Sequence, residues 1–303
     1  MKVKPRISIS VPGAESSEAY FSLQVQQALA NESSEFAEPD ELFVLSDIEG
    51  NFKPFYKLLV KNKIIDQSCN WTFGEGHVVI NGDCFDRGEQ VTECLWLIYS
   101  LEESARRAGG YVHFILGNHE IMNMNGDWRY VHPRYAEHTR SKRPHAALYD
   151  ASNELWRWLH TKNIIEKIGE TLFVHGGIAS EIVNLRLSVP EINHIARPYY
   201  GSANEAFSDP LLTAIYNGES SPFWHRGYYN GTVTEEEVDR ILAHFEVNTI
   251  ITGHTVINQV NSFFNGKVIN VNTDHAAGNS EALFISKGQF YRIKADGSRD
   301  RLK

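Results

Sequence analysis

The segment that decides the fold is residues 82–88, which read Gly-Asp-Cys-Phe-Asp-Arg-Gly and follow the apolar run Val78–Ile80 almost directly. A short β-branched run that ends in glycine and a charged residue predicts a strand followed by a sharp loop. Ligands of open α/β sheets bind at the carboxyl ends of the strands. One loop of this kind is a weak signal, because aspartate and glycine are ordinary turn residues. The pattern gains weight only if other strands end in the same way.

Four further apolar runs of the sequence do so. Each leads into aspartate, asparagine or histidine with glycine close by: Leu42–Leu45 before Asp47, Val112–Leu116 before Gly117-Asn118-His119, Thr171–Val174 before His175, and Thr249–Ile251 before Gly253-His254. Helical stretches such as Val91–Arg107 separate the runs, and strands that alternate with helices predict an α/β fold with parallel pairing. After residue 255 antiparallel strands are expected instead, so the sheet arrangement is predicted to be mixed.

The polar residues at these strand ends are metal ligands by type. They comprise three carboxylates, one amide and two imidazoles, namely Asp47, Glu49, Asp83, Asn118, His175 and His254. Mixed oxygen and nitrogen ligands without thiolate suit Mn, Fe or Zn better than Ca or a structural zinc. Six ligands exceed what one catalytic metal with open positions needs. They suit two metals roughly 3.5–4 Å apart that share one carboxylate.

Taken in order, these motifs resemble those of the calcineurin-like metallophosphoesterases over roughly residues 40–290, on the test of motif in its structural context. The family's DxHGN, GDxxDRG, GNHE and two histidine motifs correspond to residues 47–51, 82–88, 117–120, 175–177 and 253–255. Within that superfamily the chain looks like the phosphoprotein phosphatase group. Residues 117–131 and 221–229 are similar to the Shewanella-like protein phosphatase branch.

The resemblance implies a particular fold and domain organisation. We expect two mixed β-sheets packed as a sandwich and flanked by helices, which gives four layers. The catalytic domain would span residues 41–303, with a helical or loop insert at about 121–165 near the active site. Residues 1–40 are expected to be an N-terminal extension, in which Tyr20–Leu29 predicts one amphipathic helix.

The resemblance also implies how the ligands are shared. The first metal would be held by Asp47, Glu49 and Asp83, and the second by Asp83, Asn118, His175 and His254, so that Asp83 bridges. We expect two divalent or trivalent ions, with manganese favoured over iron, zinc or magnesium. A hydroxide between the two metals would attack phosphorus in line.

The remaining site residues are predicted to handle the proton and the phosphate. His119 is the candidate general acid, and the Asp86 carboxylate would keep it cationic. Arg87 and Arg226, together with Asn118, are the candidate phosphate-binding residues, because guanidinium groups match the fork of phosphate oxygens.

Arg129 is a further candidate for phosphate binding. It lies in residues 127–145, a segment with five positive and two negative side chains in an otherwise acidic protein. The segment is either a rim that attracts a phosphorylated substrate or a solvated helix face, and the sequence favours neither.

Glu49 stands where the family usually has histidine. A carboxylate there should favour a harder ion, such as manganese or magnesium, over zinc, and should raise the pKa of bound water. An altered but active centre is favoured over a weakened first metal site, because the other ligands, the acid and the clamps are present. Near the place of a family Asp-Thr-Gly sequence, Asp274 and His275 are either supports of the metal ligands or a turn.

Composition limits the partners. The 303 residues carry a formal net charge of -9, which argues against nucleic-acid or membrane binding. Cys69, Cys84 and Cys94 have neither disulfide-framework nor zinc spacing and predict reduced thiols in a cytoplasmic protein. No apolar run approaches the roughly 18 residues of a spanning helix, and a leader removed beforehand would leave no trace in this sequence.

Three functions are compatible with these residues. The favoured one is a two-metal phosphomonoesterase that acts as a protein phosphatase on phosphotyrosine or phosphoserine/threonine. The second is a hydrolase of small phosphorylated metabolites or dinucleoside polyphosphates. The third is a catalytically weakened phosphate-binding module, for which Glu49 is the only motivation. The expected partner is therefore a phosphorylated protein or a small phosphorylated substrate.

Overall fold

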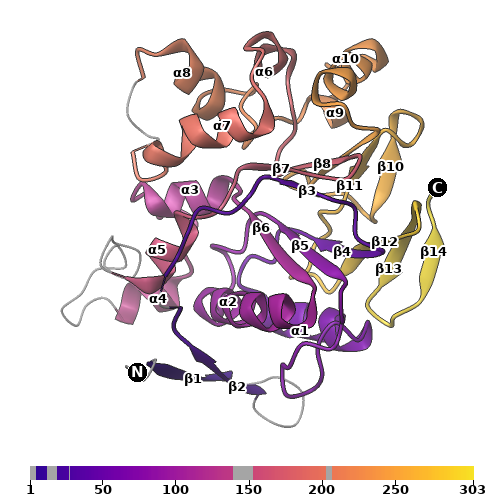
Figure 1. Ribbon diagram of the computed structural model, residues 1–303. Coiled ribbons are helices and arrows are strands. Elements are labelled where there is room, and N and C mark those ends of the chain that lie inside the picture. The colour runs from indigo at the N-terminus through magenta and orange to yellow at the C-terminus, as the bar shows by residue number, and fades with distance from the viewer. Residues whose placement is uncertain (1–4, 12–18, 27, 139–152, 203–206) are drawn as a thin grey trace.

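Two six-stranded sheets stacked between layers of helices make up the protein in the computed structural model (Figure 1). The structure describes residues 5–11, 19–26, 28–138, 153–202 and 207–303. Part of the predicted insert at 121–165, and with it Arg140, Lys142 and Arg143 of the basic segment, lies outside these residues.

The first sheet carries three of the predicted strand-end motifs. Its order is β14-β13-β12-β4-β5-β6. The strands are β4 (Glu41–Leu45), β5 (His77–Asn81), β6 (Tyr111–Ile115), β12 (Glu281–Ser286), β13 (Gln289–Lys294) and β14 (Arg299–Arg301). β4, β5 and β6 pair in parallel, and β12, β13 and β14 add antiparallel strands at the β4 side. The predicted mixture of parallel and antiparallel pairing is confirmed.

The second sheet carries the two histidine motifs. Its order is β10-β11-β9-β8-β7-β3. The strands are β3 (Glu35–Phe36), β7 (Ile165–Ile168), β8 (Thr171–Val174), β9 (Thr249–Thr252), β10 (Asn261–Phe263) and β11 (Val268–Asn270). β8, β9 and β11 are parallel, whereas β7 and β10 are antiparallel to their neighbours in that group. β3 lies within the predicted extension and pairs in parallel with β7.

Alternating side chains of the strands explain the layers. Leu42 and Val44 of β4 belong to one buried cluster with Phe173 and Ile251 of the second sheet. The side chain between them, Phe43, packs in the other cluster with residues of the covering helices. Successive strand residues point to opposite faces, so a strand buried on both faces is apolar throughout. The core therefore lies partly between the sheets and partly beneath the helices.

The helices form the two outer layers (Figure 1). The first sheet is covered by α1 (Phe52–Lys61) and α2 (Val91–Ala108). Above the second sheet lie α6 (Ser180–Asn184), α7 (Val189–Ala196), α8 (Pro210–Tyr216), α9 (Gly227–Asn230) and α10 (Glu235–Phe245). Three further helices, α3 (Asn118–Met124), α4 (Pro133–His138) and α5 (Glu154–Leu159), lie to one side of the sheets. This order of helices, sheet, sheet and helices confirms the expected α/β sandwich.

The N-terminal segment differs from its prediction. The helix expected over Tyr20–Leu29 is wrong, because β2 (Ala19–Gln24) pairs with β1 (Arg6–Val11) as an antiparallel hairpin. Phe21 and Leu23 are both buried, two residues apart, which is the period of a strand and not of a helix. Pairing with β1 and packing near α2 overrode the helical pattern. Among the described residues, no helix is both long and apolar enough to cross a membrane.

Candidate metal centre

The carboxyl ends of β4, β5, β6, β8 and β9 converge, although these strands belong to two sheets. Buried Asn81, the last residue of β5, joins the sheets at this point. Its side-chain Nδ2 donates hydrogen bonds to the carbonyl oxygens of Val174 on β8 (3.1 Å) and Ile251 on β9 (3.3 Å). The histidine loops of the second sheet are thereby held against the carboxylate loops of the first.

Many of the site residues have a left-handed backbone. The non-glycine residues with φ between 47° and 71° in these loops are Asp47, Glu49, Asp83, Asp86, Arg87 and His254. Such a conformation costs roughly 1–2 kcal/mol per residue, and it persists only where surrounding contacts impose it. Here the loops hold one another: the amides of Asp47 and Glu49 donate to the carbonyls of Gly82 and Asp83, both at 2.9 Å. Clustered strain of this kind is typical of a functional site.

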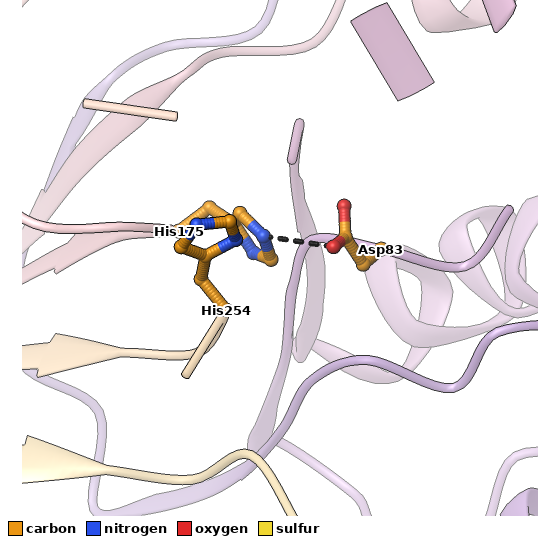
Figure 2. A group of neighbouring side chains, drawn as sticks. All are labelled: Asp83, His175 and His254. Atoms are coloured by element: carbon orange, nitrogen blue, oxygen red, sulfur yellow. Dashed lines mark ion pairs between the residues drawn. The ribbon is translucent and has the colours of Figure 1, made fainter. Parts of the chain in front are cut away.

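Asp83, His175 and His254 form the centre of the site (Figure 2). One ligand atom from each lies within 4.8 Å of the others. The His175 Nε2 atom is 3.0 Å from Asp83 Oδ2, and its Nδ1 donates to the carbonyl of Asn81 at 2.8 Å. A carbonyl can only accept, so this bond fixes Nδ1 as the protonated nitrogen and aims Nε2 into the site. The arrangement is one that a metal ligand requires.

His254 completes this group with an unused nitrogen. Its Nε2 is buried and has no hydrogen-bond partner among the described residues. Burial and the neighbouring charge of His175 lower the pKa of His254 to about 2, so its imidazole is neutral. A buried lone pair without a partner carries a desolvation cost that a metal ion would remove. The donor set therefore fits a metal on this side of Asp83.

The carboxylates of the centre repel one another. Burial and the charge of Asp83 raise the pKa of Asp47 to about 6, although His175 lowers it. Burial lowers the pKa of His175, but Asp83 and Asp47 raise it more, to about 10. In the absence of metal, a proton on His175 thus balances charge that a cation would neutralise. Asn118 lies beside this ring, with its Oδ1 atom 3.1 Å from His175 Nε2.

Glu49 lies on the other side of Asp83. Its carboxylate, Asp83 and His119 each offer one ligand atom within 4.8 Å of the others. Glu49 Oε1 also forms an ion pair with the guanidinium of Arg87. Burial and the charge of Asp47 raise the pKa of Glu49 to about 7, against the opposing effect of Arg87. The Glu49 carboxylate is thus close enough to Asp83 to share a cation with it. It is also close enough to Arg87 to form an ion pair.

His119 has the environment of a general acid. Its Nδ1 is 2.5 Å from Asp86 Oδ2, and Asn123 donates to the other Asp86 oxygen at 2.9 Å. The His119 Nε2 atom faces Asp83, 3.9 Å from Oδ2. Burial lowers the pKa of His119, but Asp83 and Asp86 raise it more, to about 9. The ring is therefore cationic near neutral pH and directs an N–H toward the centre.

The three candidate phosphate-binding arginines differ in how they are held relative to the metal centre. Arg226 donates from Nη1 to the carbonyl of His254 (3.0 Å) and to the Thr255 hydroxyl (3.1 Å), which anchors its guanidinium beside the centre. Arg129 instead pairs with Asp127 at 2.6 Å, and 65% of its side chain is exposed. Arg87 reaches the centre through its ion pair with Glu49.

Two supporting residues were not predicted. Glu120 is completely buried, and its two oxygens accept hydrogen bonds from the amides of Asp83, Cys84, Phe85 and Gly117 at 2.7–3.3 Å. The other is Asn81. Glu120 lies within a recognised motif and Asn81 lies directly before one, so both positions could have been singled out. Their roles could not be predicted, because a hydrogen bond to a backbone amide or carbonyl requires no particular residue type in the partner.

The alternatives left open for residues 274 and 275 are resolved differently for each. The ring of His275 is buried, and its Nε2 lies 3.1 Å from the carbonyl of Ser46, directly before Asp47. His275 therefore supports the loop of a candidate ligand. Asp274 accepts from the Ala277 amide at 2.9 Å, as in a turn.

The chain belongs to the calcineurin-like phosphoesterase family, which matches residues 42–258. It is a phosphoric ester hydrolase, and it is similar to Shewanella-like protein phosphatase 2 of Arabidopsis thaliana. That similarity is 25% identity over 298 residues, which cover 82% of this chain and 74% of the plant protein. Shewanella-like protein phosphatase 1 of Plasmodium berghei is 24% identical over 83% of this chain and 70% of its own length.

Solved structures agree with this assignment. The crystal structure of a cold-active protein-tyrosine phosphatase of a psychrophilic Shewanella species is 39% identical to this chain, with a TM-score of 0.90. The match covers 97% of this chain and 90% of the other. A protein serine/threonine phosphatase of Saccharomyces cerevisiae, 18% identical with a TM-score of 0.61, shares the fold. The resemblance inferred from the motifs is confirmed.

Proposed function

We propose that this phosphoesterase is a two-metal protein phosphatase. The observation that carries the proposal is the buried Nε2 of His254, which has no hydrogen-bond partner among the described residues and lies beside Asp83 and His175. The His119–Asp86 pair lies on the other side of Asp83. A metal-ligand group and a protonated imidazole on either side of one carboxylate are the parts that hydrolysis of a phosphate ester needs.

Six side chains would hold the metals. Asp47, Glu49 and Asp83 would take one ion, and Asp83, Asn118, His175 and His254 the other. When bound, two ions supply the positive charge that acidifies an attacking water and balances the phosphoryl oxygens. The carboxylate at Glu49 favours manganese over zinc, because hard oxygen ligands suit the harder ion.

The chain's own residues would handle the leaving group. His119 would donate its Nε2 proton to the departing oxygen, and Asp86 would hold the ring in that orientation through Nδ1. Arg226 and Arg87 would bind the phosphate oxygens, with Asn118 beside them. Arg129 would act at the rim, since its guanidinium is engaged by Asp127.

The substrate class is supported by the relatives. The Shewanella structure is described as a protein-tyrosine phosphatase, and 39% identity over nearly the whole chain favours a phosphorylated protein as substrate here too. Turnover of a phosphotyrosine peptide, a phosphoserine peptide and diadenosine tetraphosphate, each with added manganese, tests this. Activity confined to the dinucleotide would contradict the proposal. One metal per chain and no turnover of p-nitrophenyl phosphate would favour a silent phosphate-binding module.

The role of His119 has a sharper test. The His119→Asn variant should lose more rate on a phosphate ester with a poor leaving group, such as phenyl phosphate, than on p-nitrophenyl phosphate. His194→Asn, at an exposed position of α7, is the matched control and should leave both rates unchanged. Equal losses on the two substrates would mean that His119 does not protonate the leaving oxygen.

A cytoplasmic location remains a prediction from the cysteine content.

A further inference from the structure

A cleft of about 670 Å³ lies directly beside the candidate metal centre. The start of α6, the loop before α9 and the start of α10 line it. Two of its lining residues touch the metal centre. Arg226 donates to the carbonyl of His254, and the Trp224 ring centroid is 5.6 Å from that of His254. A phosphorylated residue held by Arg226 would therefore have this cleft next to it.

The charge of the cleft is opposite to that of its phosphate-binding edge. Glu181, Glu219 and Glu237 all line it, and Arg226 is the only cation among its lining residues, all of which the structure describes. Arg226 is turned toward His254 and Thr255. The interior of the cleft therefore repels a phosphate group and attracts a cation.

The carboxylates are not all compensated. Glu237 caps α10 by accepting from the Thr234 amide at 2.9 Å, and it lies 3.9 Å from Arg240. Glu181 and Glu219 are exposed, and no residue that the structure describes forms an ion pair with either. Two negative charges on the lining are thus not neutralised by an ion pair with any described residue.

His225 also lines the cleft, and it carries an unsatisfied acceptor just beneath the surface, next to Gly227. Only 7% of this residue is exposed, and its Nδ1 is 3.0 Å from the Glu219 carbonyl. Because a carbonyl only accepts, Nδ1 carries the proton, and burial lowers the pKa of the ring so that it is neutral. Its Nε2 is then a bare acceptor, and it has no partner among the described residues. The uncompensated carboxylates of the lining therefore call for a positively charged donor.

The chemistry of the occupant follows from these groups. Arginine and lysine side chains carry only donors and a positive charge. The Trp224 ring, 37% exposed at the edge shared with the metal centre, offers a face on which a guanidinium can stack. Neighbouring residues of an extended peptide are about 3.8 Å apart along the chain, so a side chain close to the phosphorylated residue can reach the cleft.

We propose that this acidic cleft, defined by Glu181, Glu219, Glu237, Trp224, His225 and Arg226, binds an arginine or lysine side chain that flanks the phosphorylated residue of the substrate. The inference rests on the proposed function, because it names the sequence preference of that same site. Arg226 binds the phosphate at one edge, and the carboxylates select a basic neighbour at the other.

The test compares matched phosphotyrosine peptides. Each pair differs at one position, from three residues before the phosphotyrosine to three residues after it. One member carries arginine there, and the other carries citrulline, which is nearly isosteric and uncharged. With wild-type protein and manganese, kcat/KM should be about tenfold higher for the arginine peptide at one or two positions, as two partly exposed charge pairs would give. The preference should shrink as salt is raised.

The variant Glu181→Gln/Glu219→Gln should abolish most of this preference. Its kcat/KM on the citrulline peptides and on p-nitrophenyl phosphate should stay at the wild-type value, which also shows that it is folded. Glu75→Gln/Glu103→Gln removes the same charge on the side of the first sheet, outside the cleft, and should keep the preference.

The outcomes separate the two proposals. Equal kcat/KM for arginine and citrulline peptides at every position would overturn the cleft inference and leave the phosphatase proposal standing. The same would hold if the preference survived in the Glu181→Gln/Glu219→Gln variant. No turnover of any phosphopeptide, with retained hydrolysis of small esters, would overturn the proposed function itself. The wild-type comparison decides the matter even if the double variant fails to fold.

Discussion

Asn81 links the fold to the site, and replacing it gives a quantitative test of that link. Its side chain is fully buried and joins β5 of the first sheet to β8 and β9 of the second. Asn81→Leu keeps the branched shape and the four side-chain heavy atoms but removes both donated hydrogen bonds. The buried carbonyls of Val174 and Ile251 then each lose a donor.

The size of the effect follows from the two bonds. A hydrogen bond contributes about 0.5–1.5 kcal/mol net, and a buried partner left unsatisfied costs about 1–3 kcal/mol. Two bonds therefore predict a loss of about 2–4 kcal/mol in the free energy of unfolding. Total stability of a domain is about 5–15 kcal/mol, so the variant should fold but with a clearly lower margin.

Urea unfolding followed by circular dichroism measures this loss. The experiment uses protein treated with chelator, because metal bound only to the folded state would add stability of its own. Asn248→Leu is the control: Asn248 is exposed and donates to the side chain of Glu170, so we expect a change within about 0.5 kcal/mol. If Asn81→Leu lost no more than this control, the sheets would not depend on Asn81 and the reasoning would be refuted.

Other residues give three further predictions. Glu49→His should raise the affinity for zinc relative to manganese, measured by calorimetric titration of metal-free protein; unchanged selectivity would show that residue 49 does not bind metal. Because the acid form of His119 is the active one and the neighbouring carboxylates of Asp83 and Asp86 hold its pKa above the usual range, kcat/KM on a poor leaving group should be maintained through neutral pH and fall tenfold per unit above the pKa of His119. A pH profile of the wild type and of His119→Asn checks this, since the variant should lack that decline. Lys162→Met removes the buried ammonium that lies 2.6 Å from Glu102 and 3.1 Å from Glu32. The Arg106 guanidinium, 3.0 Å from Glu32 and 3.6 Å from Glu102, still compensates part of their charge. Urea unfolding should therefore register a loss of about 3 kcal/mol, the low end of the range for breaking a buried pair, and a loss below 1 kcal/mol would show that Lys162 is dispensable.

The site residues that could be predicted from the sequence are those that belong to a local sequence pattern. A strand, a glycine and a ligand are consecutive in the chain, so residues such as Asp83 and His254 were placed at strand ends correctly. The order of the motifs then identified the family. Arg129 shows the boundary of this reasoning, because a charge next to a motif gave no sign that Asp127 would engage it.

Contacts between distant segments of the chain could not be predicted from the sequence. Nothing in the sequence around Asn81 indicates that its side chain forms hydrogen bonds with strands more than 90 positions later in the chain. The hairpin of β1 and β2 was mistaken for a helix because its pairing and packing, and not its local propensity, determine it. Both failures concern partners far along the chain, and a pattern within one segment carries no information about them.

Glu49 departs from the family's usual histidine, and its contacts show what the carboxylate does at this position. Histidine at this position would be neutral and could not pair with a guanidinium, whereas the Glu49 carboxylate binds Arg87 directly. The same carboxylate lies within 4.8 Å of ligand atoms on Asp83 and His119. It therefore stands between the candidate metals and a candidate phosphate clamp and is within reach of both. Only 12% of the Glu49 side chain is exposed, so its carboxylate is held at this point between the two groups. This position argues for an altered, active centre over a weakened first metal site.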